Sequence, residues 1–164
     1  MAQVSLVKYI SNYRVSSVLN RDVTSLGKQN LFDTSLETCW NSEQGTPQHI
    51  LVEFAPRVCI SKVHVQFQGG FAGKDTRLID MDRKEEICPL FPDDNNKMQV
   101  LELPVSEQGV ARRRIKLQFA TSTDFYGRIV VYSLDFCGSV ADDAEPTAKN
   151  TDSTCASDAV ITIV

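Results

Sequence analysis

The sequence has 164 residues, of which 42% are hydrophobic and 23% are charged. This length and composition predict one globular domain with a buried core and exclude two domains of ordinary size. No run of about 18 apolar residues offers a membrane helix, and the first ten residues lack the basic flank and apolar stretch of a secretory signal.

The net charge of −4 comes from the end of the sequence. Residues 139–164 contain five acidic side chains and one lysine, which leaves residues 1–138 without net charge. A neutral domain has no electric field to attract nucleic acid, so direct DNA or RNA binding is not expected. The composition predicts an N-terminal segment over 1–13, a domain over 14–138 and a disordered acidic tail over 139–164.

Short segments with a period of two run along the domain. In residues 60–68, for example, Val63, Val65 and Phe67 face one way and His64 faces the other. The same pattern recurs in residues 50–54, 99–103 and 114–119. Residues 129–136 begin apolar on both faces, as in a central strand that is covered on two sides. Glycine and proline separate these runs, and only 12–20 and 24–32 could hold a helical turn. The sequence therefore predicts an all-β sandwich or barrel.

The cysteines do not have the spacing of a zinc site. The five are Cys39, Cys59, Cys88, Cys137 and Cys155, and none of them forms a C-x-x-C pair. Structural zinc needs closely spaced thiolates, so we expect no metal site and instead free, mostly buried thiols in a reducing compartment.

One loop motif carries most of the information about the fold. Asp33, Thr38, Trp40 and Ser42 stand in the pattern D-x4-T-x-W-x-S. A buried tryptophan supplies core area, while the aspartate and threonine can bond the backbone amides of a turn. We therefore interpret the motif as core and loop support rather than as a binding site.

This motif, the strands after it and the closing Phe136-Cys137-Gly138 resemble the factor five/eight type C, or discoidin, domain. The resemblance implies an eight-stranded jelly-roll β-sandwich of the galactose-binding-like fold. In many relatives the same loop holds calcium, which makes Asp33 and Thr38 weak calcium candidates. Here Thr34 replaces the usual glycine and Ser133 the usual late acid, so no cofactor is the first expectation.

Several longer blocks carry a closer resemblance. They are residues 14–21, 31–45, 67–71, 94–96 and 123–128. Together they resemble the nuclear-receptor-associated proteins typified by the repressor partner of the orphan receptor called testicular receptor four. That family implies an intracellular adaptor, in nucleus or cytoplasm, that binds a nuclear receptor and restrains transcription.

Jelly-roll modules bind ligands through loops at one end of the sandwich, so exposed loop side chains are binding candidates. The candidates are Phe71, Asp94, Asn95, Asn96, Asp124, Phe125, Tyr126 and Arg128. Each has a plainer interpretation. Phe125 and Tyr126 could cap the core, which is slightly favoured, and Arg128 could pair with Asp33 or Asp124. Residues 93–96 could be a solvated turn, and residues 112–114, three arginines, a solvated strand edge.

The last residues form a second candidate. Thr162 and Val164 place a threonine two residues before a terminal valine, a pattern that PDZ domains capture by strand addition. Short patterns of this kind recur by chance.

No arrangement of nucleophile, base and orienting group is visible, so an enzyme is not expected. The leading hypothesis is a monomeric module that binds a protein, with no membrane or nucleic-acid partner. The alternatives are carbohydrate or lipid recognition, as in extracellular discoidin domains, and a scaffold subunit of an intracellular complex.

Overall fold

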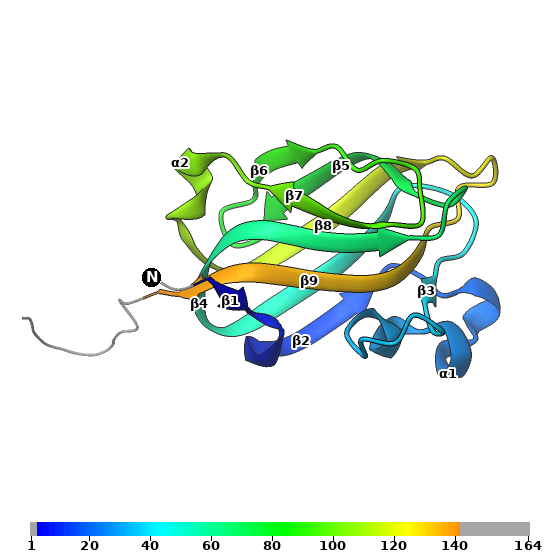
Figure 1. Ribbon diagram of the computed structural model, residues 1–164, viewed down its shortest axis with the longest axis horizontal. Helices are drawn as coiled ribbons and strands as arrows, with labels where there is room; N and C mark the ends of the chain where they lie inside the picture. Colours follow the sequence, from blue (N-terminus) through cyan, green and yellow to red (C-terminus); the bar gives the residue numbers. More distant parts are fainter. Residues whose placement is uncertain (1–2, 142–164) are drawn as a thin grey trace, which may run out of the picture.

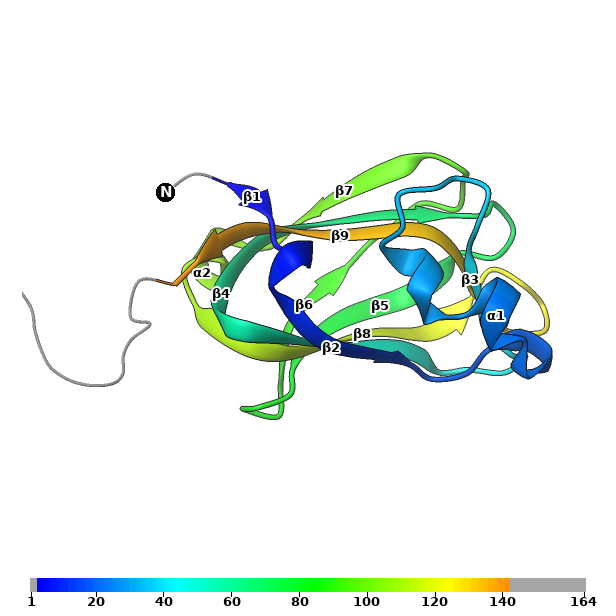
Figure 2. The same cartoon turned by 90° about the horizontal axis from the view of Figure 1, so that it is seen from below.

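The computed structural model describes residues 3–141 as two packed layers of antiparallel β-strands (Figures 1 and 2). The strands are β1 (Val4–Ser5), β2 (Ile10–Val15), β3 (Trp40–Asn41), β4 (Gln48–Phe67), β5 (Gly73–Asp80), β6 (Glu85–Leu90), β7 (Met98–Glu102), β8 (Ala111–Ser122) and β9 (Val130–Val140). Short helices connect them: η1 (Val7–Tyr9), η2 (Leu19–Arg21), α1 (Val23–Leu26), η3 (Lys28–Leu31) and α2 (Val105–Gln108). No helix within residues 3–141 is long and apolar enough to cross a membrane.

Strand β4 belongs to both layers. Its first half pairs with β2 and β8, and its second half pairs with β9 and β7. The ladder with β8 shifts register between Glu53 and Val58, and Pro56 in this stretch has no N–H to donate to a ladder. At this corner β4 bends from one layer to the other, near α2 (Figure 2).

The space between the layers is filled by the alternating apolar positions of the strands. Val63, Val65 and Phe67 are buried, as the period of two predicts. Two edge-to-face aromatic pairs span the core: Phe54 with Phe136, whose ring centroids are 6.0 Å apart, and Phe67 with Phe119, 5.7 Å apart. The all-β jelly-roll expectation is confirmed.

The sheets extend beyond the expected boundaries. Residues 3–13 are not a separate segment, because β1 pairs with β9 and β2 begins at Ile10. Part of 12–20, expected to hold a helical turn, is instead the β2 strand. Residues 3–141 form nine strands rather than the eight implied, and two of them, β1 and β3, have only two residues. Strand β9 runs to Val140 and Ala141 N donates to Arg57 O, whereas residues 142–164 of the expected tail lie outside the described residues.

One of the three consecutive arginines is part of the interior, which corrects the expectation of a solvated edge. The Arg112 side chain is only 3% exposed; its Nε lies 3.1 Å from Asp80 Oδ2 and its Nη2 lies 2.6 Å from Glu107 Oε1. Arg83 Nη1 also contacts Asp80, at 2.8 Å. Burial opposes ionisation of the Asp80 carboxyl, but hydrogen bonds and charge from Arg83 and Arg112 outweigh it and lower the pKa of Asp80.

We expect Asp80→Ala to lower the free energy of unfolding by about 3–5 kcal/mol at neutral pH, because it leaves the Arg112 charge buried with one partner fewer. The half-exposed pair Arg114–Asp82 offers a matched control, and Arg114→Ala should leave the free energy of unfolding almost unchanged. Denaturant unfolding measures both.

The same experiment has a pH dependence. Since the folded pKa of Asp80 is depressed, its stabilisation is present above the ordinary carboxyl pKa of about 4 and is lost as the pH falls through the lower folded value. The destabilisation by Asp80→Ala should therefore shrink in acid. An equal penalty at every pH would contradict an ionised Asp80.

Candidate interaction surface at the loop end

Three connections meet at the end of the sandwich opposite α2: the β4–β5, β6–β7 and β8–β9 loops (Figure 1). The first two are tied by hydrogen bonds from backbone to side chain. Gly69 N donates to Asn96 Oδ1 at 2.7 Å, and Gly70 N donates to Asp94 Oδ1 at 2.8 Å. Asn95 Oδ1 accepts from Lys97 N at 2.9 Å within its own turn. The side-chain oxygens of Asp94 and Asn96 thus satisfy backbone amides of the neighbouring loop, and that of Asn95 satisfies an amide of its own turn.

Arg128 joins the β8–β9 loop to the β4–β5 loop. Its Nε lies 3.0 Å from Asp124 Oδ2, and its guanidinium carbon lies 5.0 Å from the centre of the Phe71 ring and 5.9 Å from that of Tyr126. The hydrogen bond from Arg128 lowers the pKa of the Asp124 carboxyl, and burial opposes it. Of the two partners considered for Arg128, the structure selects Asp124.

Phe125 and Tyr126 form the tip of this surface. Their side chains are 92% and 57% exposed, and their rings pack edge to face with centroids 5.2 Å apart. The interpretation that they cap the core is therefore wrong. The backbone beneath them is fixed, because Gly45 N donates to Tyr126 O at 2.8 Å and Gln48 Nε2 donates to Gly45 O at 2.7 Å. The result is an aromatic protrusion on a supported loop.

The D-x4-T-x-W-x-S residues make local contacts. Asp33 Oδ1 accepts from Ser35 N at 3.0 Å, and Asp33 Oδ2 accepts from the Thr38 hydroxyl at 2.5 Å. Trp40 is fully buried and its indole donates to Ser17 O at 2.8 Å. Ser42 Oγ accepts from Ile129 N at 2.8 Å. Both oxygens of Asp33 serve its own loop.

The solved structures of similar shape are carbohydrate-binding and discoidin-type modules. A family 32 carbohydrate-binding module of NanJ from Clostridium perfringens, solved with galactose, superposes with a TM-score of 0.66 at 11% identity, covering 83% of this chain and 99% of the module. An F5/8 type C domain from Bacteroides fragilis gives 0.64 at 11% identity, covering 79% of this chain and 92% of that domain. These likenesses establish the fold alone.

Curated relatives decide the family. The protein of Danio rerio named nuclear receptor 2C2-associated protein is 45% identical over 137 residues, which cover 82% of this chain and 95% of the relative. Its namesakes in Xenopus laevis and Homo sapiens are 49% and 41% identical over 128 residues, covering 76% of this chain and 91% and 89% of the relatives. The chain belongs to the nuclear receptor 2C2-associated protein family. No family model matches it.

The cysteines of this family member differ from expectation in their burial. None of the four within residues 3–141 forms a disulfide; Cys88 is buried, whereas Cys39, Cys59 and Cys137 are only half-buried. Burial raises the pKa of the Cys88 thiol to about 11, with Glu107 adding to the effect. Cys155 and the C-terminal pair Thr162 and Val164 lie outside the described residues.

Sequence reasoning also missed a group of side chains. His64, Asp135 and Cys137 come together on the outer face of β4 and β9. The strand pattern predicted that His64 faces outward, but not that the other two side chains lie near it. No spacing in the sequence signals this group, because the ladder between two distant strands creates it.

We expect Gly127→Ala to disturb the aromatic protrusion. Gly127 has φ +84°, and a Cβ there would lie 2.9 Å from Gly45 N. Gly45, with φ +97° and no atom within 4 Å of a Cβ placed there, is the matched control. Gly45→Ala should cost about 1–2 kcal/mol of unfolding free energy from backbone strain alone. Gly127→Ala should cost roughly 1–3 kcal/mol more, because of the clash.

Denaturant unfolding of both variants checks this difference, and chymotrypsin cleavage at Phe125 and Tyr126 reports the loop directly. Equal destabilisation by the two substitutions would show that the Gly45–Gly127 contact does not hold the loop.

Proposed function

We propose that this chain is a non-enzymatic adaptor that binds a nuclear receptor through the aromatic protrusion at its loop end and restrains transcription by that receptor. Membership of a family named for association with nuclear receptor 2C2 supports the choice of partner. Similar solved structures include carbohydrate-binding modules with bound sugars, which supports binding rather than catalysis as the use of this fold.

The observation that carries the proposal is the exposure of Phe125 and Tyr126 on a supported loop. An aromatic side chain that is 92% exposed leaves its apolar area in water, and association with another protein removes that area. Tyrosine and arginine are enriched among the residues that dominate protein interfaces. The guanidinium carbon of Arg128 lies 5.9 Å from the centre of the Tyr126 ring, so this part of the surface combines a tyrosine with an arginine.

The shape of this surface favours a protein over a sugar. Small ligands bind in concave sites that cover most of their surface. Phe125 instead projects into solvent, and Arg128, the nearest guanidinium, is engaged by Asp124 and the Phe71 ring. A protruding aromatic anchor fits a recess on a partner protein better than it encloses a sugar ring.

We place this function in the nucleus or the cytoplasm. Those compartments keep thiols reduced, and no two of the four cysteines within residues 3–141 form a disulfide.

The test uses the purified full chain and purified nuclear receptor 2C2 in isothermal titration calorimetry. The double variant Phe125→Ala, Tyr126→Ala should bind at least about 30-fold more weakly, since loss of an interface hot spot costs about 2 kcal/mol or more. The matched control is Val105→Ala. Val105 is 86% exposed on α2, at the opposite end of the molecule, and its loss should leave affinity unchanged.

A reporter gene driven by the receptor tests restraint, because the wild-type chain should lower its expression and the double variant should not. Unchanged affinity in the double variant would refute the loop-end surface. Competition by galactose would indicate a carbohydrate site instead. Loss of binding confined to Val164→Asp would move the contact to the C-terminus.

A further inference from the structure

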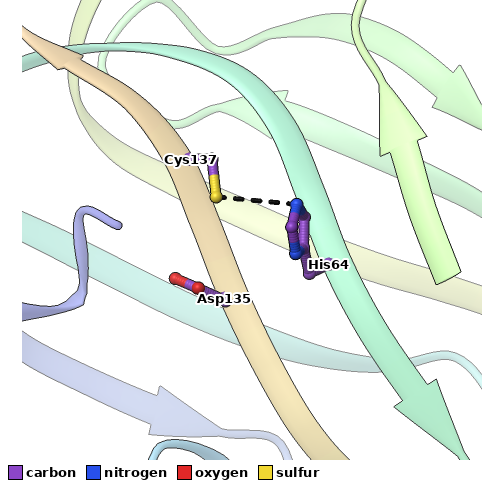
Figure 3. Close-up of side chains that lie close together, drawn as sticks. All are labelled: His64, Asp135 and Cys137. Carbon is purple, nitrogen blue, oxygen red and sulfur yellow. Dashed lines mark hydrogen bonds between the residues drawn. The ribbon is translucent and has the colours of Figure 1, made fainter. Parts of the chain in front are cut away.

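Three side chains with metal-binding atoms gather on the outer face of the sandwich, away from the loop end. One ligand atom from each of His64, Asp135 and Cys137 lies within 4.8 Å of the other two, and all three residues are half-buried. Figure 3 shows His64 of β4 directed toward Cys137 of β9, whereas the Asp135 carboxylate projects to the other side of β9. Within residues 3–141, no other three histidine, cysteine or acidic residues bring their ligand atoms this close together.

The antiparallel ladder explains why they meet. His64 is the direct partner of Asp135, and Cys137 lies two residues further along β9, on the same face. On the far side of β9, Ser5 of β1 is the partner of Cys137. Both β4 and β9 are flanked by other strands here, so the three side chains project from a rigid surface.

The distance between the nitrogen and sulfur atoms fits a shared ion. His64 Nε2 and Cys137 Sγ are 3.6 Å apart. Two ligands of one tetrahedral zinc ion, with Zn–N of about 2.05 Å and Zn–S of about 2.3 Å, lie about 3.6 Å from each other. The Asp135 carboxylate lies within 4.8 Å of the Cys137 sulfur and of one ring nitrogen of His64, and it has to move closer to complete a third tetrahedral contact.

We propose that His64, Asp135 and Cys137 bind one Zn²⁺ ion, with the fourth coordination position open to solvent. The donor types select the metal, because a thiolate and an imidazole suit zinc, whereas calcium and magnesium take oxygen ligands. A bound thiolate and carboxylate also supply two negative charges to a dication. Three protein ligands and one open position are the arrangement of zinc sites that exchange their fourth ligand.

The surroundings of Asp135 support this role. The Ser5 hydroxyl donates to Asp135 Oδ1 at 2.7 Å, and such an outer contact orients a carboxylate for metal binding while its second oxygen stays available. Lys62 is the partner of Cys137 in the ladder between β4 and β9, and it brings a positive charge to the same face. In the ladder between β4 and β7, the partner of Lys62 is Glu102.

The experiment titrates the metal-free full chain with Co²⁺, which substitutes for zinc and is visible. One equivalent should produce the intense absorption of four-coordinate cobalt and a thiolate-to-cobalt charge-transfer band, and Zn²⁺ should abolish both. A large excess of Ca²⁺ should leave them unchanged.

Variants assign the ligands. Cys137→Ser should eliminate the charge-transfer band, and Asp135→Asn should weaken binding at least about tenfold. Cys39→Ser is the matched control, since Cys39 is also a half-buried free thiol, and it should behave as the wild type.

Circular dichroism of the metal-free variants establishes that they fold. Added Zn²⁺ should raise the unfolding midpoint of the wild type and of Cys39→Ser, but not that of Cys137→Ser. A charge-transfer band that survives in Cys137→Ser, or cobalt binding without such a band, would overturn the proposal. In that case the contact between His64 and Cys137 is only a weak hydrogen bond.

Discussion

Both layers of the sandwich depend on β4, because its two halves pair with different neighbours. The bend between Glu53 and Val58 places the first half of β4 in one layer and the second half in the other. The first half fixes the register of β2 and β8, and the second half fixes that of β9 and β7. Strand β4 also contributes to both candidate sites. Its end at Phe67 starts the loop that carries Phe71, and His64 projects from its outer face.

The loop end shows how a common fold is adapted to a particular surface. The fold is shared with sugar-binding modules at 11% identity, so the architecture alone does not select a ligand. Here the side-chain oxygens of Asp94 and Asn96 accept hydrogen bonds from backbone amides. The Arg128 guanidinium contacts both Asp124 and the Phe71 ring. The aromatic pair 125–126 stays exposed and is suited to burial against another protein.

Some side chains have roles that their neighbours in the sequence do not reveal. Three consecutive arginines look equivalent, yet Arg112 lies in the interior because Asp80, from a strand far away in the sequence, offers its carboxylate there. Phe125 and Tyr126 could equally have covered the core from the same position in the chain. Their exposure follows from the path of the β8–β9 loop, which the contact between Gly45 and Tyr126 sets. His64 and Cys137 are 73 residues apart and meet only through the ladder.

The sequence by itself determined the class of fold, the inward positions of its strands and the family. These are local properties: an alternation of period two, the D-x4-T-x-W-x-S loop and blocks of residues in a fixed order. Only the tertiary structure decided where β1 and β2 join the sheet, which loop residues remain exposed and which thiol faces an imidazole. The physical reason is that these outcomes depend on pairing between strands distant in the chain, and a shift of one residue in such pairing would turn each side chain to the opposite face.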